Sequence, residues 1–328
     1  MDSPQLIPNA RELWSASRLI SGELAPTPIA YSEYFGGLLD RDVYLKVETA
    51  QPGGSFKMRG ALNRLVGPDA PDAIITSSSG NHGAALAMLG SRMGVEVTVV
   101  VPGCTPSTKI EKARALGAEV LVVGEIYDDA EAHARELAST SGRPYVSGFE
   151  DRAVVAGAAT IVPEILDQIG QIGTILVPVG GGGLITGICT ALEILSPKTE
   201  VIGVQPRASD PLVQSFRAGH PVDVEHGPTL SEGTAGGIPA KIVRHLIPRI
   251  GDALAVAEGE IADAIRHLLL VEKVVSEGAG ALTSAALTSK SIAEPPLWPA
   301  PVVAVVSGGN IEATRLSEIL SGDANFTS

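Results

Sequence analysis

Short apolar runs alternate along this chain with amphipathic segments, and this alternation is the feature that most restricts its fold. One example begins with the apolar run Val97–Val101, which Pro102 and Gly103 end. A helical segment then spans Ser107–Leu116, and Glu119–Val123 is the next apolar run. A strand, a helix and a strand within about 30 residues predict a right-handed parallel crossover. Because the chain repeats this arrangement, we predict an α/β fold with largely parallel sheets.

The same patterns predict the other strands and helices. Apolar runs of about four to eight residues fit strands covered on both faces, whereas a period of two fits a half-buried strand. The predicted strands are Val43–Glu48, Ala73–Thr76, Val95–Val101, Glu119–Val123, Thr174–Val179, Val201–Val204 and Val302–Val306. The predicted helices are His82–Met93, Ser107–Leu116, Tyr127–Ser139, Val154–Gln168, Leu184–Leu195, Glu260–Val271 and Ile311–Leu320. The proline-rich stretch Ser291–Pro301 predicts a loop before the last strand.

The charge balance narrows the range of partners. The chain carries 24 Lys and Arg against 37 Asp and Glu, which gives a formal net charge of −13. An acidic surface repels phosphate backbones and anionic lipids, so we expect neither nucleic acid nor a membrane as a partner. Cys104 and Cys189 are too few for a disulfide scaffold, and the first residues lack the pattern of a signal peptide. We therefore expect a cytoplasmic protein.

A run of four glycines, Gly180–Gly183, lies between a predicted strand and a predicted helix. Backbone amides without side chains, together with the positive end of a helix, can bind a phosphate. A tight turn with positive φ needs only one or two glycines, so four in a row favour a ligand. Leu184 stands at the third position of the dinucleotide-binding pattern that ends at Gly187, and no Gly-Lys pair occurs anywhere. The predicted phosphate therefore belongs to another kind of cofactor.

Two further segments are ambiguous when each is taken alone. Lys57 lies in the small, partly apolar stretch Gly53–Gly60. A lysine amine in a dry pocket can act as a nucleophile or a base, but a solvated lysine on a helix face is the simpler interpretation. Val305–Asn310 is a strand followed by a glycine turn, which fits a structural turn and a binding segment equally well.

The segment Thr76–Gly83 places hydroxyl groups, glycine and Asn81 between a predicted strand and a predicted helix. The amides at such a helix start can bind a carboxylate. Ordinary capping of the helix by Ser79 or Asn81 is the alternative. Three serines followed by Gly-Asn-His exceed what a cap requires, so a binding role is favoured.

Taken together, these segments resemble the fold type II pyridoxal-phosphate enzymes, the tryptophan synthase β-like family, and most of all their threonine dehydratase and serine racemase branch. Ser55-Phe-Lys-Met-Arg-Gly-Ala61 is similar to the family's Schiff-base segment, and Ser78-Ser-Gly-Asn-His-Gly83 to its substrate and cofactor loop. Gly180–Leu184 is similar to its phosphate loop, and Ser307-Gly-Gly-Asn310 to its pyridine-nitrogen segment. Further matches are Leu45-Lys-Val-Glu48, Thr105-Pro-Ser-Thr-Lys109, Gly117-Ala-Glu-Val120 and Glu277-Gly-Ala-Gly280, all in the family's order.

The resemblance implies a fold, a cofactor and an assembly. It implies an α/β architecture of two open, mostly parallel, twisted sheets flanked by helices. Pyridoxal 5'-phosphate is expected in the cleft between a large and a small domain. We expect the large, cofactor-binding domain at residues 1–70 and 152–328, and the small domain, inserted within it, at residues 71–151. A homodimer that acts on a small amino-acid substrate is also implied.

The resemblance also assigns roles to individual residues. Lys57 is expected to hold the cofactor covalently and, once released, to take the Cα proton of the substrate as a general base. Phe56 is expected to wall the cofactor ring, Asn81 to bond its hydroxyl, and Ser307 to face its nitrogen. The residues expected to hold the cofactor phosphate are Gly180, Gly181, Gly182, Gly183 and Leu184. The residues expected to hold the substrate carboxylate are Ser78, Ser79, Gly80, Asn81 and His82.

The implied reaction is an ammonia-lyase reaction, in which L-threonine, L-serine or a related 3-hydroxyamino acid is dehydrated to a 2-oxo acid and ammonia. Ser79 leaves serine or amino-acid racemisation open, because a hydroxyl opposite Lys57 can return a proton to Cα and invert it. Within the family, 3-hydroxyaspartate dehydratase and a dehydratase of hydroxyectoine catabolism are further alternatives. Outside it, a catalytically silent amino-acid binder is an alternative that Lys57 disfavours.

The segment Val204–Pro211 departs from the pattern of the racemase-like members, which bind a divalent cation through carboxylates here. Gln205 and Pro211 stand where those members have acidic residues. Such cations need oxygen ligands that are usually charged, so we predict no metal site. Thr229–Gly237 also departs from the family's usual Ala-Asp-Gly, which leaves the choice of substrate open.

Overall fold

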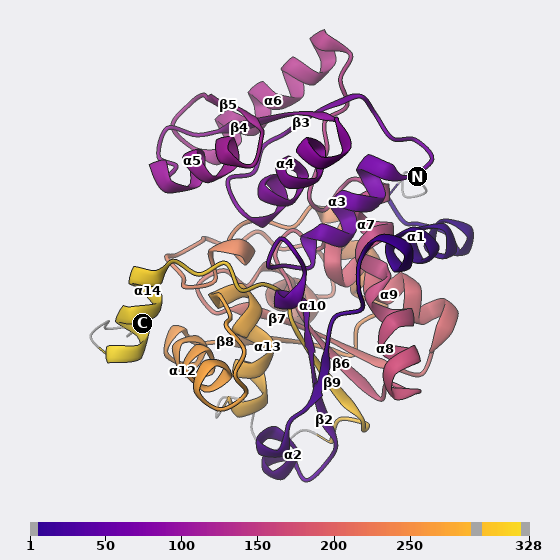
Figure 1. Cartoon of the computed structure of the whole chain (residues 1–328). Helices are drawn as coiled ribbons and strands as arrows, with labels where there is room; N and C mark the ends of the chain where they lie inside the picture. The colour runs from indigo at the N-terminus through magenta and orange to yellow at the C-terminus, as the bar shows by residue number, and fades with distance from the viewer. Residues whose placement is uncertain (1–5, 290–296, 323–328) are drawn as a thin grey trace. The chain divides into compact units, whose positions relative to one another are not determined.

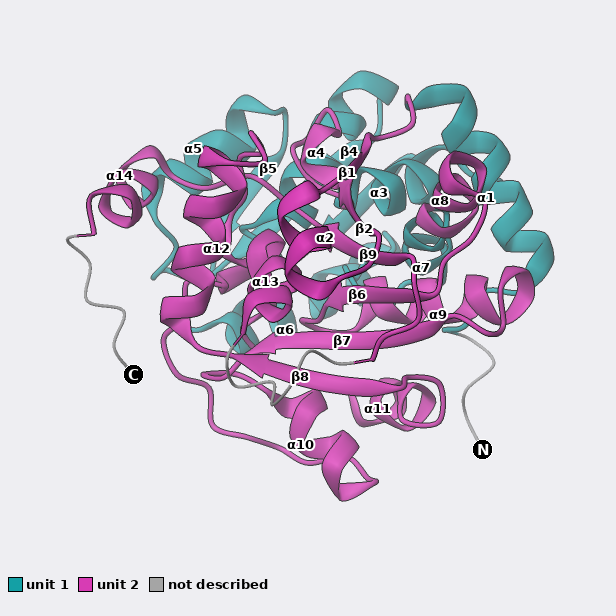
Figure 2. Ribbon diagram, turned by 90° about the horizontal axis from the view of Figure 1, so that it is seen from below, with its two compact units in different colours: residues 1–24, 57–160 teal, residues 25–56, 161–328 magenta. Residues whose placement is uncertain are grey.

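The computed structural model describes residues 6–289 and 297–322. The chain divides into two compact units (Figure 2). Unit 1 comprises residues 1–24 and 57–160, and unit 2 comprises residues 25–56 and 161–328. The chain therefore passes from one unit to the other more than once, and the peptide bond between Phe56 and Lys57 is one of these crossings.

Unit 2, in its described residues, is built on a six-stranded sheet. In spatial order its strands are β1 (Ile29–Tyr31), β2 (Val43–Val47), β9 (Val302–Val306), β6 (Thr174–Pro178), β7 (Glu200–Pro206) and β8 (Asp252–Val256). The edge strand β1 is antiparallel to β2, and every other neighbouring pair is parallel. The carboxyl ends of the parallel strands therefore share one edge of the sheet, beyond which ligands bind in open parallel sheets.

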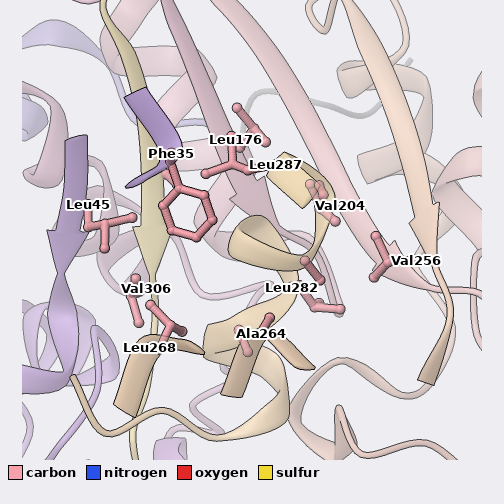
Figure 3. Close-up of a cluster of buried hydrophobic side chains, with 14 of the residues drawn as sticks. Phe35, Leu45, Leu176, Val204, Val256, Ala264, Leu268, Leu282, Leu287 and Val306 are labelled. Carbon is pink, nitrogen blue, oxygen red and sulfur yellow. The ribbon is translucent and has the colours of Figure 1, made fainter. Parts of the chain in front are cut away.

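Helices supply the rest of the core of unit 2. Every residue of the central strands β9 and β6 is buried, which requires cover on both faces of the sheet. Figure 3 shows Phe35, Leu176 and Leu282, from a helix, a strand and another helix, within one apolar cluster. The helices are α2 (Glu33–Leu39), α8 (Ile161–Ile169), α9 (Gly183–Leu195), α10 (Pro211–Ala218), α11 (Ala240–Leu246), α12 (Glu258–Leu270), α13 (Gly278–Thr288) and α14 (Ala313–Ser321), with short 3-10 turns η1 (Glu48–Ala50) and η2 (Glu232–Thr234).

Unit 1 has a smaller parallel sheet, of three strands in the part of the chain that the structure describes. These strands are β3 (Ala73–Thr76), β4 (Glu96–Val101) and β5 (Glu119–Val122). The helices around them are α1 (Ala10–Glu23), α3 (Lys57–Val66), α4 (Asn81–Met93), α5 (Ser107–Ala115), α6 (Tyr127–Ser141) and α7 (Arg152–Ala159) (Figure 1). Beyond the strands, Tyr145 forms a parallel bridge with Ile75 of β3.

The predicted α/β class is confirmed, and each predicted strand overlaps an observed one. The single helix predicted at Val154–Gln168 is wrong, because α7 ends before Thr160 and α8 begins after it. The Thr160 hydroxyl donates to the backbone oxygen of Gly157 at 2.7 Å, and Pro163 lacks the N–H that would continue the helical ladder. The loop expected at Ser291–Pro301 lies largely outside the described residues.

The boundaries of the two units differ from the boundaries of the expected domains. We expected residues 1–70 in the large domain, but α1 and α3 belong to unit 1. The reason is that α3 packs against α4 and α7, and α1 packs against α3 and α7. Side chains such as Ile20 and Leu62 then join the same apolar core as β3 and β4. Lys57 consequently belongs to the unit that contains the Thr76–Gly83 segment.

Glycines allow the close approach of α3 and α7. A Cβ atom on Gly157 would lie 2.4 Å from the backbone oxygen of Arg59, and one on Gly60 would lie 2.7 Å from Val154 Cγ1. Neither contact can be relieved without moving a helix, because backbone and buried branched side chains are involved.

Gly157→Ala is therefore expected to lower the free energy of unfolding by ~1–3 kcal/mol, in the range of other overpacked sites. Denaturant titration followed by circular dichroism measures this change. Gly22→Ala in α1 is the matched control, because nothing lies within 4 Å of a Cβ there. Equal effects of the two substitutions would contradict the close approach.

Candidate active site

Lys57 is the first residue of α3, and its amine is buried although part of the side chain is accessible. Its Nζ donates a hydrogen bond to the backbone oxygen of Gly148 at 2.9 Å. Burial lowers the pKa of Lys57 from 10.5 to about 8, because leaving water disfavours an ammonium ion. Near pH 8 about half of the molecules would then carry an uncharged amine, the form that acts as nucleophile or base. The interpretation of Lys57 as a solvated lysine is not what the structure shows.

The imidazole of His82, in the first turn of α4, lies close to this amine. A Cβ atom on Gly148 would lie 3.0 Å from Lys57 Nζ and 3.1 Å from His82 Cγ. His82 Nε2 is 3.1 Å from the backbone oxygen of Val146, and a carbonyl oxygen only accepts, so Nε2 carries the hydrogen. Burial, and then the charge of Lys57, lowers the pKa of His82 to about 3. The ring is therefore neutral, and its buried Nδ1 is an acceptor with no donor among the described residues.

Two hydrogen bonds hold the end of β3, where the serine-rich loop begins. The Thr76 hydroxyl donates to the backbone oxygen of Val146 at 2.8 Å. The hydroxyls of Ser77 and Tyr145 share a hydrogen bond of 2.7 Å. The segment after α6 thus fixes both the start of this loop and the ring of His82, so the predicted carboxylate-binding residues start from a fixed position.

The start of α4 carries no capping side chain. Gly80 occupies the N-cap position, with φ −100° and ψ −153°, and it has no side chain that could accept from the backbone. The alternative in which Ser79 or Asn81 is the capping residue is therefore wrong. Gly80 itself therefore supplies no capping acceptor to the first turn of α4, and the positive end of the helix favours an anion there.

The four-glycine run joins β6 to α9 in unit 2. Gly182 is the N-cap residue of α9 and has φ +92°, a backbone conformation that other residues rarely adopt. A Cβ atom on Gly182 would lie 2.6 Å from Ile242 Cγ2, and one on Gly180 would lie 3.0 Å from the Cα of Thr234. The turn itself therefore requires glycine at these two positions. The same lack of side chains leaves bare backbone at the start of a 13-residue helix, as an anion cradle requires.

The segment that ends at Phe56 pairs with the segment that follows β9, and both belong to unit 2. Phe56 N donates to the backbone oxygen of Ser307 at 3.0 Å, and Gly309 N donates to that of Gly54 at 2.9 Å. Ser55 and Gly308 form an antiparallel bridge between these two bonds. The structure therefore brings Phe56 and Ser307 together, as the assignment of both residues to one cofactor ring requires.

Two side chains extend this pairing. Asn310 Nδ2 donates to the backbone oxygen of Gly53 at 2.9 Å, which holds the segment before Phe56 from its other end. Ser307 is buried, and its hydroxyl makes one long hydrogen bond of 3.4 Å to the backbone oxygen of Ala279. A bond of this length is weak, so the Ser307 hydroxyl can turn to another acceptor or donor at little cost.

Gln205, expected to be a poor metal ligand, instead links the end of β6 to α10. Its buried Nε2 donates to the backbone oxygen of Val179 at 3.2 Å. Its Oε1 accepts from Leu212 N at 2.7 Å and from Val213 N at 3.4 Å. The described residues contain no group of three or more His, Cys, Asp and Glu placed to hold a metal ion, and the absence of a metal site stays a prediction.

The assigned residues are divided between the two units. Unit 1 contains Lys57 and Ser78–His82, whereas unit 2 contains Phe56, Gly180–Leu184 and Ser307. Gly148 is not predicted from the sequence, because nothing near it in the chain indicates a contact with a lysine 91 positions away. His82 is predicted for its backbone only, although a histidine beside a helix start was a signal that its ring could lie near the lysine amine.

The chain belongs to a family of cofactor-dependent enzymes. The family model for pyridoxal-phosphate dependent enzymes matches residues 20–308, which is most of the chain and contains every assigned site residue. The protein is therefore a member of the pyridoxal-phosphate dependent enzymes, the family that the motifs predicted.

Relatives within the family share sequence over nearly the whole chain. L-threonine ammonia-lyase of Thermotoga maritima is 36% identical over 314 residues, 94% of this chain and 77% of that protein. A catabolic L-threonine dehydratase of Staphylococcus aureus is 36% identical over 308 residues, 92% of this chain and 88% of that protein.

Solved structures agree with this relationship. A threonine deaminase from T.th. superimposes with a TM-score of 0.83 at 35% identity, over 93% of this chain and 99% of that chain. Maize serine racemase superimposes with a TM-score of 0.88 at 25% identity, over 96% and 97% of the two chains. Among the described residues, no helix has the length and apolar character needed to cross a membrane.

The residues present fit pyridoxal phosphate. The enclosed amine of Lys57, with its lowered pKa, suits reaction with an aldehyde. The glycine run at the start of α9 suits a phosphate, and the weakly bonded hydroxyl of Ser307 suits a neutral ring nitrogen. The buried acceptor on His82 requires a donor that the described protein groups do not supply.

Lys57→Met is expected to stabilise the cofactor-free protein at pH 7. The folded state there holds an amine whose pKa is lowered to about 8, so folding must either bury the charge or release a proton. The shift from 10.5 sets an upper bound of about 3 kcal/mol on the gain. The gain should be full below pH 8 and shrink as the pH rises toward 10.5.

Thermal unfolding of both proteins at a series of pH values measures this gain. Lys198→Met, at an exposed position, is the control and should change stability little at any pH. A Lys57→Met variant that is less stable than the unsubstituted protein at pH 7 would contradict the burial of the amine.

Proposed function

We propose that this protein is a pyridoxal-phosphate-dependent dehydratase, an ammonia-lyase that converts L-threonine, L-serine or a related 3-hydroxyamino acid to a 2-oxo acid and ammonia. The observation that carries the proposal is the enclosed amine of Lys57, which lies beside the uncapped start of α4 in a chain 36% identical to threonine ammonia-lyases. We also propose that the enzyme is a cytoplasmic homodimer, for which sedimentation of the purified protein gives the mass.

We propose the following roles in cofactor binding. Lys57 holds the cofactor covalently, Asn81 bonds its ring hydroxyl, and Phe56 walls the ring. The backbone of Gly180–Gly183 with Leu184 holds the phosphate, and Ser307 faces the ring nitrogen. Bound pyridoxal phosphate supplies an electron-withdrawing group that acidifies the Cα–H bond of an attached amino acid.

The residues of the chain bind the substrate, orient it and move its proton. Backbone amides of the Ser78–His82 segment hold the substrate carboxylate at the positive end of α4. This contact turns Cα toward the amine of Lys57, and such orientation can contribute several kcal/mol to catalysis. Once the substrate amine has replaced it on the cofactor, Lys57 takes the Cα proton, because near pH 8 a large share of its free amine is uncharged. The β-hydroxyl takes up a proton and leaves as water, so that the Cα hydrogen and the hydroxyl together make up the water lost. The released enamine then reacts with a second water to give the 2-oxo acid and ammonia.

Reduction with borohydride tests the cofactor role of Lys57. After incubation with pyridoxal phosphate, the protein should be yellow, and borohydride should attach the cofactor to the peptide that contains Lys57. Lys46 is the internal control, because its amine is buried against the Glu164 carboxylate at 2.5 Å and should stay unmodified. A colourless protein that retains no pyridoxal phosphate would falsify the proposed function.

A panel of 3-hydroxyamino acids tests the substrate class. It should include threonine, serine and 3-hydroxyaspartate in each Cα and Cβ configuration, together with hydroxyectoine-derived hydroxyamino acids. Ammonia and 2-oxo acid are expected from L-threonine or L-serine. If only other 3-hydroxyamino acids react, the dehydratase stands and the choice of substrate changes.

Racemisation is the second candidate function, and it is favoured by Ser79. Its position beside the N-cap residue Gly80 leaves its hydroxyl outside the capping role, and maize serine racemase superimposes closely on this chain. A hydroxyl on the face of Cα opposite Lys57 can deliver a proton there and invert the centre.

Ser79→Ala is therefore expected to lower racemisation at least about 10-fold more than elimination, a typical size for the loss of a proton donor. Chiral chromatography of the remaining substrate and assay of the 2-oxo acid measure the two rates. Ser78→Ala is the control, because it removes a neighbouring hydroxyl and keeps the backbone. Parallel loss of both activities in Ser79→Ala would assign Ser79 another role.

A further inference from the structure

The segment from Tyr145 to Gly148 is fixed against the sheet of unit 1. Ile75 N donates to the backbone oxygen of Pro144 at 3.0 Å, and Val146 N donates to that of Ile75 at 2.8 Å. The segment therefore runs beside β3 as a short extension of the sheet. Side chains add to this hold, because both Thr76 and His82 bond to the backbone oxygen of Val146. The backbone of Gly148, two residues after Val146, is consequently held in a defined position.

Gly148 follows on this segment and meets the amine of Lys57 in two ways. Its backbone oxygen accepts the hydrogen bond from Lys57 Nζ at 2.9 Å. Its missing side chain leaves space, because a Cβ atom there would be 3.0 Å from Nζ and 3.1 Å and 3.3 Å from two atoms of the His82 ring. The φ of Gly148 is not positive, so the conformation of the backbone does not require glycine. The space taken by the lysine and histidine side chains is what excludes a larger residue.

We infer that Gly148 is a positioning residue for the proposed reaction, which holds the amine of Lys57 through its backbone oxygen and makes room for it by lacking a side chain. This inference rests on the proposed function, since it concerns the amine that takes the Cα proton. A base that must reach one hydrogen of the substrate needs a defined position before the transfer. A lysine side chain has four rotatable bonds, so a hydrogen bond to an acceptor fixed to the sheet removes much of its conformational freedom before the proton transfer.

Gly148→Ala tests the inference. The added methyl group would lie 3.0 Å from the Lys57 amine, which is the far end of a flexible side chain, and 3.1 Å from the His82 ring, which needs to yield by only a few tenths of an ångström. The amine should therefore move while the backbone keeps its fold. We expect kcat to fall about 10- to 100-fold, as for a reacting group displaced by about 1 Å. KM should stay within about 2-fold, because no group that holds the substrate is removed.

Acylation of the cofactor-free protein reports on the position of the Lys57 amine independently of the catalysed reaction. With acetic anhydride at pH 8, Lys57 in the unsubstituted protein should react more slowly than the exposed Lys198. In Gly148→Ala, the displaced amine loses its hydrogen bond, and its rate relative to Lys198 should rise several-fold. Gly22→Ala is the control, since a Cβ atom there meets nothing within 4 Å.

The outcomes separate the two proposals. A fall in kcat together with faster acylation of Lys57 supports the positioning role. Unchanged kcat and acylation in Gly148→Ala would overturn it, as would a fall in kcat that leaves acylation at the control value. If Gly148→Ala does not fold, acylation of Lys57 as fast as Lys198 in the unsubstituted protein would overturn it. An unsubstituted protein that forms no 2-oxo acid but shows the acylation pattern would refute the function and leave the contact standing.

Discussion

The removal of one amine from water is the constraint on which the rest of this site depends. Burial of Nζ lowers the pKa of Lys57 to about 8, and a neutral His82 lies beside this amine. A carboxylate at that place would stabilise the ammonium and keep the lysine charged. The uncharged, reactive form of the amine is therefore favoured both by burial and by a neighbour, His82, that carries no negative charge.

Close backbone approach builds both parts of the site. In unit 2, Gly180 and Gly182 allow the turn before α9, and the pairing of Phe56 with Ser307 uses backbone groups alone. In unit 1, Gly148 leaves room for a lysine. In both units, glycine residues and backbone groups thus make the close contacts of the candidate site.

The local sequence pattern predicted those strands and helices whose own residues determine their structure. Val302–Val306 is wholly apolar and forms β9 with those bounds. By contrast, α13 is buried on almost every side and has no polar face, so its sequence lacks the helical period. The site followed the same rule. The glycine run was predicted from its local motif and the role of Lys57 from the resemblance of its segment to the family, whereas the contact of Gly148 and the bonds of Gln205 depend on segments brought together only by folding.

The bare start of α4 links binding to local order. A helix whose N-cap is Gly80 has no acceptor on the N-cap residue's side chain, so its first turn is held slightly less firmly than one capped by serine or asparagine. An anion bound there would supply an acceptor, and part of its binding free energy would become free energy of ordering for the turn that contains His82. The affinity for such an anion and the order of this turn are then linked, because each contributes to the same free energy of binding.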